Sequence, residues 1–134
     1  MDIGIANCRF ETGANDVDQS ELKDRTKQFA LRMIRLTQSL PENVVGRAIA
    51  SQLMRCGTSV GANYRSACKG RSRAEFIAKI GVVEEEADES AFWMEVIIEA
   101  GLMKARAIQS LLDEVTQLVA IMAASRKSAS RHKG

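Results

Sequence analysis

Apolar residues recur along this chain at alternating spacings of three and four positions, the pattern that one face of an α-helix produces. Charged and polar residues fill the positions between them, as expected of helices that bury one face and expose the other. The pattern predicts four helices, over residues of about 18–40, 43–70, 72–101 and 102–125. No stretch shows the strict alternation of a strand, so the predicted fold class is all-α.

Local signals mark where the predicted helices begin and end. Asp18 precedes Glu21 by three positions, and Ser72 precedes Glu75 in the same way. This spacing is typical of a capping box, in which the first side chain accepts a hydrogen bond from a backbone N–H at the start of a helix. Pro41, the only proline, ends the first predicted helix because its ring cannot continue one.

Four amphipathic helices joined by short links favour an antiparallel up-and-down four-helix bundle. We expect this bundle to span residues 18–125. Residues 1–17 are polar and contain glycine, which predicts a flexible N-terminal arm. Residues 126–134 form a basic tail that we expect to be frayed.

Two glycines interrupt the second predicted helix, although glycine costs roughly 1 kcal/mol relative to alanine inside a helix. Gly57 and Gly61 lie beside the apolar seam, on the same arc as Tyr64. The missing Cβ atoms allow close approach by a neighbouring helix of the bundle or by another subunit; a hinge or a ligand contact is the alternative. Asn63 falls on the seam itself, which predicts a buried amide that fixes helix register or, alternatively, contacts a bound partner.

The third predicted helix carries more apolar surface than one bundle can cover. In "AFWMEVII", residues 91–98, only Glu95 is polar. Phe92 and Trp93 point about 100° apart, so they cannot both enter one narrow seam. We expect self-association through this helix, with the arm or the tail covering Trp93 as the alternative. The candidate interface residues are Gly57, Gly61, Tyr64, Phe92 and Trp93.

Charge separates by helix, although the net charge is only +2. Residues 43–74 hold six basic side chains and no acid, whereas residues 75–99 hold eight acids and one base. The two helices can pair with each other, or the basic surface can remain free for phosphates. The candidate nucleic-acid contacts are Arg47, Arg55, Arg65, Lys69, Arg71 and Arg73.

The sequence argues against catalysis and against a metal site. The acidic run "EEEADE" would need nearby histidines to form a metal centre in a bundle, and the only histidine is His132, in the predicted tail. Cys56 lies on the apolar seam without a nearby base, and "GTSVGAN" lacks the lysine of a phosphate-binding loop. We therefore expect no enzymatic activity, no cofactor and no metal.

The cysteines and the first residues predict a compartment. Three cysteines without metal-ligand spacing are typical of a reducing cytoplasm. The first residues lack the basic start and apolar centre of a signal peptide, and no apolar run approaches the 18 or so residues of a membrane span. We expect a cytoplasmic protein with no membrane partner.

Residues 51–102 carry a more specific set of motifs. They are Gln52-Leu53, Arg55, Ser59-Val60 with Ala62-Asn63, the "RSRAEF" link, Glu85, Ala87, Glu89 and Phe92-Trp93. On these residues the chain resembles the four-helix-bundle family named after proteins encoded in intervening sequences of bacterial 23S ribosomal RNA genes. The resemblance covers about residues 24–125.

This resemblance implies an up-and-down bundle that assembles into a homo-oligomeric ring, commonly of five subunits, without catalytic residues. A relative, the accessory variability protein of diversity-generating retroelements, resembles a basic barrel that binds nucleic acid and a reverse transcriptase. By this resemblance Arg55, Arg65, Lys69, Arg71 and Arg73 would contact phosphates. The acidic third helix of the present chain weakens that implication.

Two functions therefore remain open at the level of the sequence. One is a ring-forming protein that binds RNA or DNA through the basic surface of the second predicted helix, by its backbone and without sequence specificity. The other is a protein-interaction scaffold or adaptor, whose basic groups are occupied by the acidic helix and whose partner is another protein.

Overall fold

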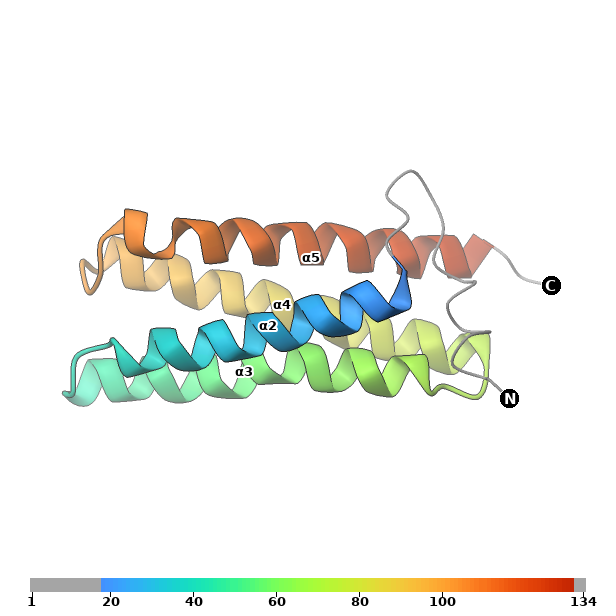
Figure 1. Ribbon diagram of the computed structural model, residues 1–134, viewed down its shortest axis with the longest axis horizontal. Coiled ribbons are helices and arrows are strands. Elements are labelled where there is room, and N and C mark those ends of the chain that lie inside the picture. The colour runs from blue at the N-terminus through green and yellow to red at the C-terminus, as the bar shows by residue number, and fades with distance from the viewer. Residues whose placement is uncertain (1–17, 132–134) are drawn as a thin grey trace.

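The computed structural model of the chain describes residues 18–131, and it contains four long helices and no strand in that range. Figure 1 shows the four helices lying alongside one another. They are α2 (Gln19–Gln38), α3 (Val44–Cys68), α4 (Arg73–Glu99) and α5 (Ala105–Arg131). The all-α prediction is confirmed.

Side-chain caps start the helices where the sequence predicts. The Asp18 carboxylate accepts a hydrogen bond of 2.7 Å from the backbone N–H of Glu21, and the Ser72 hydroxyl accepts one of 3.1 Å from the N–H of Glu75. Asn43 caps α3 in the same way. Each cap satisfies a backbone donor that has no partner within its helix, so both predicted capping positions are confirmed.

Two glycines shape the turns between helices. A Cβ atom on Gly46 would lie 1.8 Å from the carbonyl oxygen of Pro41, so the link before α3 packs directly onto the first turn of that helix. Gly101 ends α4 with φ +75°, a left-handed conformation that favours glycine. The N–H of Leu102 then donates to the carbonyl of Ile97 over 3.0 Å, which closes the helix end.

Consecutive helices pack side by side, and α2 also touches α5. The guanidinium of Arg25 donates two hydrogen bonds of 2.9 and 3.0 Å to Glu114, and Arg32 donates to Ser110 over 2.8 Å, which ties α2 to α5. The hydrogen bond to Glu114 raises the pKa of Arg25. The largest fully buried side chains of the core are Tyr64, Phe29, Phe76, Leu22, Met33, Leu53, Ile80, Met94, Ile97, Ile108, Leu118 and Met122.

The C-terminal end of the bundle differs from the prediction. Helix α5 continues through Arg131, and Ser128 and Ala129 are buried. The expectation of a frayed tail from residue 126 is therefore wrong for residues 126–131, because small side chains there continue the buried face of the helix. The predicted arm, residues 1–17, and residues 132–134 lie outside the described residues.

Candidate functional site

The two glycines of α3 serve a close approach within one chain. A Cβ atom on Gly57 would lie 2.8 Å from Cγ of Met33, and one on Gly61 would lie 3.2 Å from the carbonyl oxygen of Thr26, both on α2. Gly57 and Tyr64 are buried inside the single bundle. Their prediction as oligomer-interface residues is therefore wrong, whereas Gly61 is half-buried and borders a surface groove.

The polar position on the seam of α3 is shifted by one residue. Asn63 is half-buried rather than in the core, and its Nδ2 donates a hydrogen bond of 2.9 Å to the carbonyl of Ser59 on its own helix. Tyr64 takes the core position instead and is fully buried. The prediction of Asn63 as a core amide is wrong, because the apolar rhythm of α3 steps by four residues from Val60 to Tyr64.

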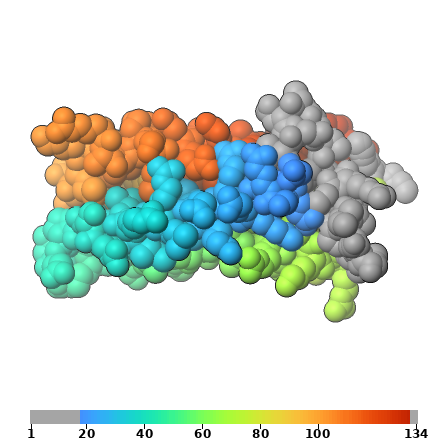
Figure 2. All heavy atoms as spheres, in the orientation of Figure 1, coloured from blue at the N-terminus to red at the C-terminus, as the bar shows by residue number. Residues whose placement is uncertain are grey.

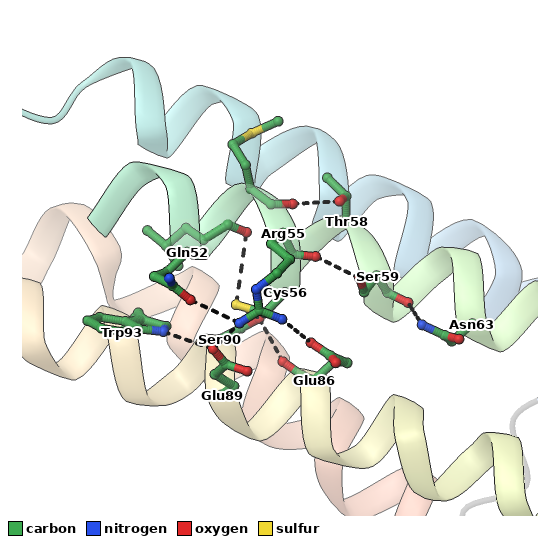
Figure 3. A network of polar contacts seen from close by, with 12 residues as sticks. Gln52, Arg55, Cys56, Thr58, Ser59, Asn63, Glu86, Glu89, Ser90 and Trp93 are labelled. Atoms are coloured by element: carbon green, nitrogen blue, oxygen red, sulfur yellow. Dashed lines mark hydrogen bonds and ion pairs between the residues drawn. The ribbon is translucent and has the colours of Figure 1, made fainter. Parts of the chain in front are cut away.

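Arg55 lies in a polar network between α3 and α4 (Figure 3). Its guanidinium pairs with Glu86 at 3.3 Å and with Glu89, and it donates to the side-chain oxygen of Gln52 at 3.0 Å. Desolvation lowers the pKa of Arg55, but the charges of Glu89 and Glu86 outweigh it and raise that pKa. Two carboxylates already pair with this charge, so Arg55 is less available to a phosphate than an unpaired cation; its role as a phosphate contact stays a prediction.

The same network orients the aromatic pair of α4. The indole Nε1–H of Trp93 donates to Glu89 over 3.2 Å, and Trp93 meets Phe92 edge to face, with ring centroids 5.1 Å apart. Trp93 is half-buried, whereas Phe92 is 52% exposed. Of the two predicted interface aromatics, Phe92 is therefore the more exposed, and the interface role of both stays a prediction.

The thiol of Cys56 is buried beneath this network. The Ser90 hydroxyl lies 3.3 Å from the Cys56 sulfur and 2.9 Å from the carbonyl oxygen of Glu86. Burial raises the pKa of Cys56, so the thiol stays protonated at neutral pH. A protonated, buried thiol is a poor nucleophile.

A groove with basic walls runs between α2 and α3 and has a volume of about 290 Å³. We call it the α2–α3 groove. Three long cationic side chains line it, Lys23 and Lys27 from α2 and Arg65 from α3. The remaining lining residues are Ala30, Thr58, Gly61 and Ala62. Figure 2 shows α2 and α3 together forming much of the visible face.

The cations of the α2–α3 groove differ from Arg55, because none of them is paired within the described part of the chain. No acidic residue lines the groove, and within residues 18–131 the side chains of Lys23, Lys27 and Arg65 form no ion pair and no hydrogen bond. Arg55, in contrast, is paired with two carboxylates. An anion that enters the groove between α2 and α3 would therefore contact cations that have no ion-pair partner among the described residues.

The other predicted cations lie at varying distances from this groove. Lys69 follows Arg65 by one helical turn, and Arg71 is exposed in the link before α4. Arg73 is half-buried at the first position of α4. Arg47 precedes Arg65 by 18 residues, about 27 Å along the helix, so it does not share the site.

Lys23 and Lys27 were not predicted as site residues. The predicted nucleic-acid contacts came from the second predicted helix and the link after it, whereas residues of two helices, α2 and α3, line the groove. A signal was present: lysines spaced four apart share one face of a helix, and Gly61 indicates that another backbone lies against α3. Only the packing of α2 on α3 identifies that backbone.

The acidic residues of α4 are divided between pairing and exposure. Glu84 accepts a hydrogen bond of 2.8 Å from Arg126 of α5, which raises the pKa of Arg126, while Glu85 and Asp88 are exposed. No group of three His, Cys, Asp or Glu side chains among the described residues is placed to hold a metal ion. The expectation that no metal binds stays a prediction.

Helix α5 is long and apolar enough to cross a membrane by length and composition. Core helices of soluble proteins often pass the same criterion, and α5 packs against α4 with one face buried. The expectation of no membrane partner stays a prediction.

The family model for the 23S rRNA-intervening sequence protein matches residues 18–124. A crystal structure of a protein with unknown function from the S23 ribosomal protein family, from Bacteroides thetaiotaomicron VPI-5482, is similar, with 29% sequence identity and a TM-score of 0.76. The match covers 81% of this chain and 97% of that chain. No curated protein matches. Because the family model covers all four helices but the end of α5, the chain belongs to the 23S rRNA-intervening sequence protein family.

Proposed function

We propose that this protein is a non-catalytic, homo-oligomeric bundle that binds the backbone of RNA or other nucleic acid through the α2–α3 groove. The observation that carries the proposal is the set of three cations from two helices around one groove, none of which pairs with an acid among residues 18–131. Lys69 and Arg71, exposed beyond Arg65, extend the same positive surface toward the start of α4.

The chemistry of the groove favours contacts to phosphates over contacts to base edges. Lysine and arginine neutralise phosphates and release counterions, so the affinity should fall with salt, by a slope of about −0.7 per phosphate on a single strand. The lining offers no aromatic ring, and Thr58 is its only uncharged polar side chain. Binding should therefore discriminate little between sequences.

We further propose an antiparallel up-and-down course and assembly into a ring of five subunits. In support of the course, Lys79 near the start of α4 contacts Ser66 near the end of α3, whereas Glu86 farther along α4 pairs with Arg55 earlier in α3. In support of assembly, Phe92 keeps half of its surface exposed. The ring size comes from the family resemblance.

The nucleic-acid proposal is tested by fluorescence anisotropy with a labelled RNA at two salt concentrations. We expect Lys27→Glu with Arg65→Glu to reduce the affinity at least tenfold, since each reversal removes one phosphate contact and adds a repulsion. The matched control is Lys104→Glu with Arg106→Glu, which makes the same change in net charge at exposed positions outside the groove. Equal losses in both double variants would contradict a role for the groove.

The second candidate function is a protein-interaction scaffold. The pairing of Arg55 with Glu86 and Glu89 favours the scaffold, because a central cation of the predicted basic surface is then bound to acids of α4. A purified protein that carries no absorbance excess at 260 nm and shows no salt-dependent RNA binding would support the scaffold and reject the first proposal.

A further inference from the structure

The α2–α3 groove is hollow because its floor is made of small residues. Ala30, Gly61 and Ala62 leave a depression, while Lys23 and Lys27 rise from one wall and Arg65 from the other. Gly61 also lets the backbones of α2 and α3 approach closely, because a Cβ atom at this position would lie only 3.2 Å from the Thr26 carbonyl oxygen. The result is an open depression with cations on both sides and small uncharged residues between them.

We infer that this groove accepts a single strand in preference to a duplex, an inference that rests on the proposed function. Packed helices lie about 8–10 Å apart between axes, so the depression between them is too narrow to admit a double helix, which carries two strands side by side. A duplex can touch only the tips of the rim cations. A single strand can enter and meet cations on both walls.

The size and polarity of the groove fit one unpaired nucleotide. Its volume of about 290 Å³ lies just below the range for small-ligand sites, roughly 300–1,000 Å³. A base can lie against Ala30, Gly61 and Ala62, with its phosphates at the lysines and Arg65. The Thr58 hydroxyl both donates and accepts hydrogen bonds, so it serves any base and adds little sequence preference.

The test compares a labelled single-stranded RNA with a blunt duplex of the same length at one salt concentration. We expect the single strand to bind about tenfold more tightly, the ratio that corresponds to about 1.4 kcal/mol for burying part of one base. Equal affinity or a preference for the duplex would overturn the inference.

A groove-filling variant provides the second measurement. Ala62→Leu adds three carbon atoms at the exposed edge of the floor without changing charge, so it should weaken single-strand binding and leave duplex binding unchanged. The matched control is Ala48→Leu, at an exposed alanine of α3 outside the groove. Similar effects of the two substitutions on single-strand binding would reject the inference.

The outcomes separate the two proposals. If neither RNA binds, the proposed function fails and the inference fails with it. If both RNAs bind equally and Lys27→Glu with Arg65→Glu abolishes binding of both, the proposed function stands and the inference alone is rejected.

Discussion

At the scale of single residues, the space around each glycine decides what a substitution does. A Cβ atom on Gly46 meets the backbone of Pro41, which cannot move aside, whereas one on Gly57 meets the flexible side chain of Met33. A Cβ atom on Gly81 meets only Cδ of Arg126, at 3.9 Å. Three helical glycines that look alike in the sequence therefore differ in how much space the surrounding atoms leave for a side chain.

This contrast predicts opposite effects of two alanine substitutions. Gly46→Ala should destabilise the protein by about 1–3 kcal/mol or more, because the added methyl overlaps the Pro41 carbonyl. Gly81→Ala should stabilise it by up to about 1 kcal/mol, the helix-propensity difference between the two residues. Urea unfolding followed by circular dichroism measures both, and a stable Gly46→Ala variant would contradict the described turn.

The buried thiol of Cys56 predicts slow chemical labelling. Burial raises its pKa, so the folded state holds the proton more tightly than the unfolded chain. The associated stability is fully present below the ordinary thiol pKa and is lost as the pH rises through the folded-state value. We expect iodoacetamide at pH 8 to modify Cys56 only when urea unfolds the protein, as measured by peptide mass mapping. Fast modification of the folded protein would contradict this burial.

At the scale of the helices, α3 divides its cations between two neighbours. Arg55 faces the acids of α4, while Arg65 faces the groove that α3 forms with α2. The helix ends were predictable because capping residues and Pro41 act locally, within four positions. The pairing of Arg55 and the participation of Lys23 were not, since both depend on which helix faces which across the bundle.

The divided roles predict different effects of two arginine substitutions. Arg55→Ala should cost little folding free energy, because its ion pairs are exposed to solvent, and should leave RNA affinity nearly unchanged. Arg65→Ala should leave stability nearly unchanged and reduce the salt slope of RNA binding by about 1 unit or less. Thermal melting and anisotropy together measure this, and the reverse pattern would reassign the phosphate contact to Arg55.

Two element-level predictions failed for related reasons. Asn63 and Tyr64 are neighbours, and a helix of 3.6 residues per turn allows either one to continue the seam; the larger apolar ring fills the core and the amide stays at the edge. Residues 126–131 look polar, but Ser128 and Ala129 are small enough to pack where a long side chain would not fit.

At the scale of the whole molecule, most of the apolar surface is hidden within one chain. Because Gly57 and Tyr64 are buried within one chain, two of the five candidate interface residues no longer support self-association. What remains is the half-buried Gly61 and, on α4, the exposed ring of Phe92 beside Trp93. The proposed ring thus depends on a smaller surface than the sequence indicated.

This surface predicts the outcome of a mass measurement. We expect the wild-type protein to be an oligomer in native mass spectrometry, and Phe92→Asp to shift it to smaller species, because a charge would be buried at the contact. Val44→Asp is the control, since Val44 is 75% exposed at the start of α3. A wild-type monomer at micromolar concentration would reject assembly altogether.

The helical end of the chain has a practical consequence. Ala129 and Ser130 border a hollow with Arg73, Ala74 and Ile77, so the last turns of α5 lie beside the first turn of α4. A reporter or affinity tag inserted after residue 125 would cut through a folded segment and uncover the beginning of α4. Fusion partners should be attached beyond Arg131, because α5 continues through that residue.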